Sequence, residues 1–184
     1  MLGLYNSLIG HFGLSLFTTI LMIICSFLFV AVSSYIVGLV GSSNNPVSGM
    51  TISALLVSAA LFLVLGEKGD SAILSTLGVA AVVCCAACTA GDCSQDLKTG
   101  NIIGATPKFQ QYAQIIGVII PAFTIAPVLT LLHEAYGIGD GLKAPQATLF
   151  ASITKALFGA GELPVSMVVY GMILGVVVLV IDGV

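Results

Sequence analysis

Apolar residues run along this chain in four long stretches that contain no Asp, Glu, Lys or Arg. These charge-free stretches cover residues 1–66, 71–91, 109–132 and 163–181. A helix needs roughly 20 apolar residues to cross about 30 Å of membrane hydrocarbon, so each of the last three stretches fits one span. The first stretch is long enough for two spans, which we place at Phe12–Val40 and Met50–Leu65. The pattern therefore predicts five membrane-embedded helices.

One compact polar insert, residues 42–49 with the sequence SSNNPVSG, interrupts the first stretch. Pro46 stops a preceding helix, and Gly49 permits another backbone to approach closely. The predicted helix before the insert has about 29 residues and would be about 43 Å long, whereas the one after it has about 16 and would be about 24 Å long. Two interpretations fit this imbalance. Either the insert is a break sunk into the membrane, or the first helix is tilted and the insert is a surface loop.

The other polar residues gather in the links between the predicted spans. Residues 67–70 form a short charged turn, and residues 91–111 form a longer polar link that holds Asp92, Asp96, Lys98 and Lys108. A Gly-rich loop at residues 133–141 follows the fourth span. Pro145 then begins a short helix to about Leu157, and Pro164 begins the final span. The short helix cannot cross the bilayer, so we expect it to lie in the interface or to re-enter the membrane.

The composition assigns the whole chain to the membrane. Of its 184 residues, 58% are hydrophobic and only 7% are charged, and its mean hydropathy is +1.16. Soluble domains carry about 25% charged residues. The chain has no Arg and a net charge of −3, so it lacks the basic face that nucleic-acid binding requires. We therefore predict one all-α, multi-pass domain of the cell membrane over residues 1–184. The N-terminus lacks the pattern of a cleaved secretory signal, so we expect residue 1 onward in the mature protein.

The cysteines and the residues that could ligate a metal do not predict an enzyme or a cofactor site. Five cysteines, mostly inside apolar stretches, favour small packing residues over disulfides. Three of them, Cys84, Cys85 and Cys88, have helical spacing that suits a soft metal, but their Ala-rich surroundings favour helix packing. His133 and Glu134 resemble the start of a zinc-protease motif, yet Gly137 stands where the second His is needed. We expect no metal, no cofactor and no catalytic residue.

Two carboxylates stand at the end of the third charge-free stretch. Asp92 and Asp96 are four residues apart, so they share one helical face if the third helix continues past residue 91. A carboxylate at the edge of a span can relay protons or pair with a cationic group. The alternative is that both belong to a solvated helix end. His133 and Glu134 are expected to end the fourth helix at the interface.

Five separate segments look like motifs of a known family. They are Gly41–Thr51, Gly91–Gly100, the GATPK sequence at 104–108, Leu131–Gly139 and the APQA sequence at 144–147. In this order and spacing, over nearly the whole chain, they resemble the oligopeptide transporter (OPT) family. The resemblance implies proton-coupled uptake of small peptides or, in related branches, of metal–chelate complexes. Two departures from the family pattern are Lys143, where an apolar residue or Pro is usual, and the cysteine cluster that includes Cys93.

Size is the largest departure from the family. Its members are several times longer, with over a dozen membrane helices, so this chain resembles an internal or C-terminal-half portion. One hypothesis is a transporter segment that works with a partner chain carrying the missing half, or with copies of itself. The other is a non-transporting membrane subunit or an inert fragment of a split transporter. Five helices seldom enclose a whole alternating-access path, because such folds pair two structural halves.

Under the transporter hypothesis, the polar residues take distinct expected roles. The insert supplies amide donors and acceptors without the desolvation cost of a charge, so we expect it to bind a peptide-like solute. The expected substrate-binding residues are Asn44, Asn45, Pro46 and Gly49, with Gln146 facing the same cavity. The expected proton-coupling residues are Asp92 and Asp96. The expected supporting polar residues are Gln95, Lys98, His133 and Glu134.

Overall fold

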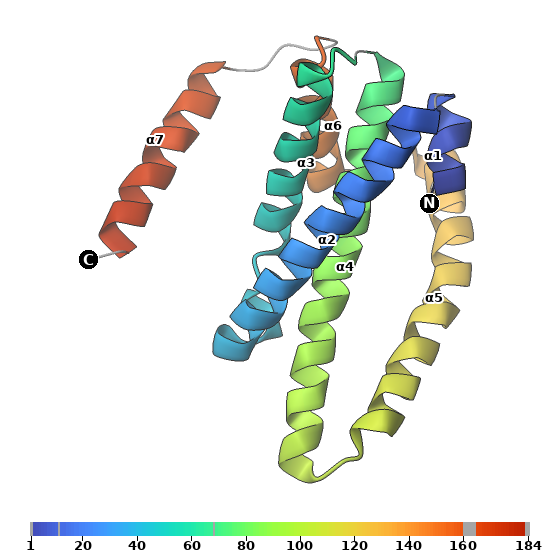
Figure 1. Cartoon of the computed structure of the whole chain (residues 1–184), viewed down its shortest axis with the longest axis vertical. Helices are drawn as coiled ribbons and strands as arrows, with labels where there is room; N and C mark the ends of the chain where they lie inside the picture. The colour runs from blue at the N-terminus through green and yellow to red at the C-terminus, as the bar shows by residue number, and fades with distance from the viewer. Residues whose placement is uncertain (1, 11, 68, 160–164, 183–184) are drawn as a thin grey trace.

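A computed structural model describes residues 2–10, 12–67, 69–159 and 165–182, which are helical over most of their length (Figure 1). The predicted all-α class is confirmed. In chain order the elements are α1 (Leu2–Ile9), α2 (Phe12–Val40), the short 3-10 helix η1 (Ser42–Asn44), α3 (Val47–Val64), α4 (Asp70–Ile103), α5 (Pro107–Tyr136), α6 (Pro145–Leu157) and α7 (Val165–Asp182).

Four of these helices, α2 to α5, are long and apolar enough to cross a membrane. They correspond to the first four predicted spans, so a multi-pass membrane protein is confirmed. The fifth predicted span corresponds to α7, in which the apolar helical run of the described residues is the shorter Val169–Asp182. Pro164, where we expect that span to begin, lies outside the described residues.

The packed part of the fold consists of α2, α3 and α4, which lie side by side with α4 in contact with both of the others (Figure 1). Small residues line these contacts, including the fully buried Ala54, Ala59 and Ala87. Small side chains let membrane helices approach closely, where van der Waals contact supplies the attraction. The larger Phe62 fills the remaining space and meets Phe17 edge to face at 6.3 Å between ring centroids.

Several buried hydroxyl groups within this packed part bond to their own helices. Thr18 and Ser58 each donate to the backbone carbonyl four residues earlier, at 2.8 Å. These bonds satisfy polar atoms that would be costly to bury unpaired. Thr76 Oγ1 of α4 and Ser26 Oγ of α2 are buried without such a partner. The short helix α1 packs on α2 and α4, where Tyr5 is buried against Gly78.

The predicted polar link over residues 91–111 is wrong, because most of it is helix. Helix α4 continues without interruption to Ile103, and the connection to α5 is only Gly104–Thr106. Charged residues mark where the apolar stretch ends, but a helix ends at a stop signal. Gly104 supplies that signal in the left-handed conformation, with φ 76°, and Pro107 starts α5. At 34 residues, α4 is about 51 Å long and exceeds the hydrocarbon thickness.

Three remaining features complete the arrangement. The predicted short helix is confirmed as α6, which packs against α3 and α4 and lies behind α3 in Figure 1. Packing against two spans favours re-entry over a position in the interface. Helix α5 diverges from α4 after their tight turn, and none of its residues is buried. Helix α7 stands apart and, within the described residues, contacts no other helix.

Candidate functional site

The polar insert forms irregular backbone between α2 and α3 and lies against α4. Gly41 leaves α2 with φ 84°, η1 makes one turn, and Pro46 precedes the first residue of α3. The Ser42 backbone N–H donates to Gln95 Oε1 of α4 at 3.2 Å. The break is therefore level with the end of the apolar stretch of α4, near residue 91. The break is packed on protein there, beside the residues at which charges reappear on α4 after its apolar stretch.

A polar cluster fastens this break to the helices beside it. Asn45 Nδ2 donates to Ser33 Oγ of α2 at 2.7 Å, and Ser33 Oγ donates to the Ala87 carbonyl of α4 at 2.5 Å. Gly91 makes the contact possible, since a Cβ there would lie 2.6 Å from Asn45 Nδ2. The close approach predicted at Gly49 is wrong, because a Cβ there would meet no atom within 4 Å, and it is Gly91 that lies tightly against a neighbouring segment.

The residues expected to bind substrate divide into two groups. The amide nitrogen of Asn45 is occupied by Ser33, while its Oδ1 is buried without a hydrogen-bond partner. Asn44, Pro46 and Gly49 are exposed, and the Asn44 amide donates to the Val40 carbonyl at 3.3 Å. Gln146 is exposed at the start of α6. Its neighbour Ala147 lines a cavity with Thr51 of α3 and with Cys84 and Cys85 of α4.

The two carboxylates lie one turn apart on α4, because that helix continues past residue 91. Asp96 Oδ2 accepts a hydrogen bond from Gln114 Nε2 of α5 at 3.3 Å, and its backbone carbonyl accepts one from Gln110 Nε2 at 3.1 Å. Gly100 leaves room for the Gln110 side chain, whose Oε1 is buried without a partner. Asp92 and Lys98 are exposed on the same stretch of helix. Of the two residues expected to couple protons, Asp96 is therefore the one that α5 contacts.

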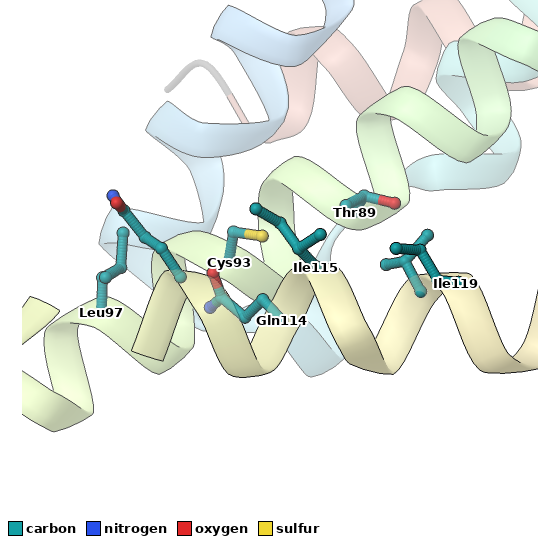
Figure 2. A pocket seen from close by; sticks show the side chains of 8 residues that line it. Thr89, Cys93, Leu97, Gln114, Ile115 and Ile119 are labelled. Carbon is teal, nitrogen blue, oxygen red and sulfur yellow. The ribbon is translucent and has the colours of Figure 1, made fainter. Parts of the chain in front are cut away.

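A cavity of about 480 Å³ opens between α4 and α5 above this contact (Figure 2). Its lining residues are Thr89, Cys93 and Leu97 of α4 and Gln111, Gln114, Ile115, Val118 and Ile119 of α5. A second cavity of about 380 Å³ adjoins it, because Gln114 lines both. Asp96, Thr99, Gln110 and Ala113 complete the second lining.

Sequence reasoning missed the glutamines of α5. Gln110, Gln111 and Gln114 lie inside a charge-free stretch, so a search for charges passes over them. Their position in the helix is a signal that could have identified them. Uncharged amides in the first turns of an otherwise apolar helix indicate a polar surface that faces protein or a cavity rather than lipid.

His133 and Glu134 are not brought near the other candidate residues. Both lie in the last turn of α5, about 29 Å along the helix from Gln114. His133 Nδ1 accepts the backbone N–H of Ile138 at 3.2 Å and so helps to close the helix end before the Gly-rich loop. The expected position at the end of the fourth helix is confirmed for both residues.

Comparison with known proteins adds to this geometry. The family model described as "OPT oligopeptide transporter protein" matches residues 3–184, which is nearly the whole chain. The chain belongs to the oligopeptide transporter family. The resemblance carried by the five sequence motifs is thereby confirmed. Membership in a family of transporters supports the expectation that the chain is not an enzyme.

Three relatives show how much of an oligopeptide transporter the chain represents. A Haemophilus influenzae protein named "Putative oligopeptide transporter" is 36% identical over 191 residues, which cover 89% of the chain and 30% of that protein. A Saccharomyces cerevisiae protein of similar name is 30% identical over 141 residues, 75% of the chain and 19% of that protein. A "Probable metal-nicotianamine transporter" of Oryza sativa subsp. japonica is 30% identical over 136 residues, 71% of the chain and 19% of that protein.

The chain thus spans less than a third of the length of these three relatives. No solved structure gives a match to it. The arrangement of α2, α3 and α4 around the polar break therefore has no matching solved structure for comparison.

Proposed function

We propose that the chain forms part of a secondary transporter that moves small oligopeptides across the membrane, driven by protons. Family membership supports transport, and the names of two relatives favour peptides as the substrate. One observation carries the proposal. The polar end of α4 contacts the broken segment through Gln95 and contacts α5 through Asp96. One rigid helix therefore connects the proposed substrate segment with the proposed proton carboxylate.

In this proposal the break between α2 and α3 contributes one wall of the substrate site. Asn45 Oδ1 is a buried acceptor without a partner, so it suits the N–H of a peptide or an ammonium group. Asn44, Pro46 and Gly49 offer the exposed side of the same segment, and Gln146 offers an amide at the start of α6. Gln95 supports the wall by holding the Ser42 backbone.

Proton coupling is assigned to Asp96 and Asp92. Neutralising a carboxylate changes the strength of its hydrogen bonds, so protonation of Asp96 weakens the bond from Gln114. That change would act on the contact between α4 and α5. Asp92, one turn earlier, and Lys98 add charge on the same exposed stretch.

A complete pathway requires more membrane helices than this chain supplies. The chain spans less than a third of its relatives, and α5 and α7 leave most of their apolar surface uncovered by the described residues. Alternating access generally pairs two structural halves. We therefore propose assembly with a chain that carries the other helices, or with further copies of this one.

A metal–chelate complex is the alternative substrate. The rice relative named as a metal-nicotianamine transporter favours it. Competition tests this alternative. A metal–nicotianamine complex would suppress peptide uptake only if the complex and the peptide bind at one site.

The proposal is tested by uptake of labelled small peptides into liposomes that hold this chain, alone and with its partner chain. We expect an inward proton gradient to drive uptake and Asp96→Asn to remove that dependence. Asp140→Asn, in the exposed loop after α5, is the matched control and should retain it. Gradient-driven uptake that is unchanged in Asp96→Asn would reassign Asp96 to a solvated position. A complete absence of uptake in both preparations would instead favour a non-transporting subunit.

A further inference from the structure

The cleft between α4 and α5 has a size that suits a small ligand. The two helices diverge from their three-residue turn (Figure 1), and cavities of about 480 and 380 Å³ follow one another along the cleft. Small-molecule sites commonly occupy about 300–1,000 Å³. Because Gln114 lines both cavities, the cleft has one apolar part and one polar part that adjoin at this residue.

The apolar part has walls from both helices. Leu97 of α4 and Ile115, Val118 and Ile119 of α5 provide aliphatic surface. Figure 2 shows Cys93 and Ile115 facing each other across the cleft, with Gln114 directly beside them. This surface matches an aliphatic or aromatic side chain of a ligand and not a charged one.

The polar groups in the same cleft favour a ligand that can form hydrogen bonds over a lipid chain. Thr89, Gln111 and Gln114 bring a hydroxyl and two amides into a largely aliphatic lining. An acyl chain makes no hydrogen bonds, so covering these groups with lipid would carry a desolvation cost. A ligand with its own donors and acceptors avoids that cost. A peptide has such groups at every residue.

Gln114 is the residue at which the two parts meet. Its Nε2 donates to Asp96 Oδ2, which leaves its Oε1 as an acceptor, and Figure 2 shows this oxygen turned toward Cys93. One amide can therefore accept a peptide N–H while it donates to the carboxylate. Such hydrogen bonds polarise one another, so a ligand at Oε1 strengthens the bond to an ionised Asp96.

We propose that the α4–α5 cleft binds a small peptide that has an apolar side chain, with the side chain among Leu97, Ile115 and Ile119 and a peptide N–H donated to Gln114 Oε1. This inference rests on the proposed transport of peptides and adds a site outside the broken segment. Gln114 is then a specificity-determining residue, and it also positions Asp96. Occupancy of the cleft and the charge of Asp96 are linked through its side chain.

Cys93 gives a direct test in the unmodified protein, because its thiol lines the cleft. Alkylation of each native cysteine by N-ethylmaleimide is followed by mass spectrometry, with and without leucyl-leucine. At a peptide concentration about ten times the dissociation constant, occupancy should slow alkylation of Cys93 about tenfold. Cys88, which is exposed on α4 and lines neither cavity of the cleft, should react at an unchanged rate.

Two variants test the assignment of Gln114 and the position of the ligand. Gln114→Ala should weaken the protecting effect of leucyl-leucine about fivefold to tenfold, the value of one buried hydrogen bond. Asn101→Ala, an exposed amide in the last turn of α4 that lines neither cavity, is the matched control and should retain full protection. Ile119→Trp fills the apolar part, so it should abolish protection even if Gln114→Ala folds poorly.

Two results would overturn the inference. The first is Cys93 alkylation that leucyl-leucine does not slow. The second is equal protection by octanoate, which would identify the cleft as a lipid site. Failure of the proposed transport looks different, because it removes uptake while leaving Cys93 protected. Uptake that persists without any protection of Cys93 contradicts only the cleft.

Discussion

The two sides of α4 differ in what covers them. On one side α2 and α3 bury Ala, Ser and Thr against α4, and the cluster of Ser33, Asn45 and Gly91 bonds three elements together. On the other side α5 is equally apolar, yet none of its residues is buried and it meets α4 only near their turn. Hydropathy is therefore similar on both sides, and both carry hydrogen bonds between helices, so the difference lies in the small residues buried where α2 and α3 meet α4.

The largest expected effect separates two phenylalanines on the two sides. Phe62→Ala in α3 should destabilise the packed helices by about 3–5 kcal/mol, because it removes a fully buried ring and leaves a cavity. Phe123→Ala in α5 changes a ring that is 79% exposed and should cost less than about 0.5 kcal/mol. Thermal unfolding in detergent, followed by circular dichroism, measures both. Equal losses would show that α5 packs as tightly as α3.

The next comparison uses two helical glycines. Gly91→Leu places a side chain where Asn45 Nδ2 lies 2.6 Å from a Cβ, and overpacking of this kind should cost about 1–3 kcal/mol. At Gly117 on α5 a Cβ would meet no atom within 4 Å, so Gly117→Leu should not lower the unfolding temperature. The same unfolding measurement applies. A neutral Gly91→Leu would mean that the break does not rest on α4.

The smallest expected effect concerns a single hydroxyl. Ser33→Ala removes the partner of both Asn45 Nδ2 and the Ala87 carbonyl, so it should cost about 1–2 kcal/mol. Ser53→Ala removes an exposed hydroxyl that bonds only within α3, and we expect almost no change. Stability is again read by thermal unfolding in detergent. A Ser33→Ala protein as stable as the Ser53→Ala control would show that this cluster does not link α2, the break and α4.

Much of the fold follows from the sequence because each predicted boundary carries a physical signal. The break at residues 42–49 and the start of α6 at Pro145 both follow from proline and polarity. The continuation of α4 to Ile103 does not follow from the charge pattern, since charges show where water begins and Gly104 shows where the helix ends. The short helix α1 was not predicted, because it lies inside a continuous apolar stretch.

The candidate site was predictable only in part. The sequence identifies Asn45 and Asp96 as polar residues at the ends of spans, but their partners come from distant segments. Ser33 and Gly91 meet Asn45, and Gln114 meets Asp96, only after helices pack. Nothing in the local pattern of one chain reveals which small residue faces which amide.

The length of α4 has a consequence for how the chain can be mapped in a membrane. A rod of about 51 Å whose apolar part is at its beginning carries the turn at Gly104–Thr106 well clear of the hydrocarbon. An epitope inserted at Ala105 would stand in water as a landmark for one face of the bilayer. Antibody access to it in sealed vesicles would give the sidedness of the whole chain.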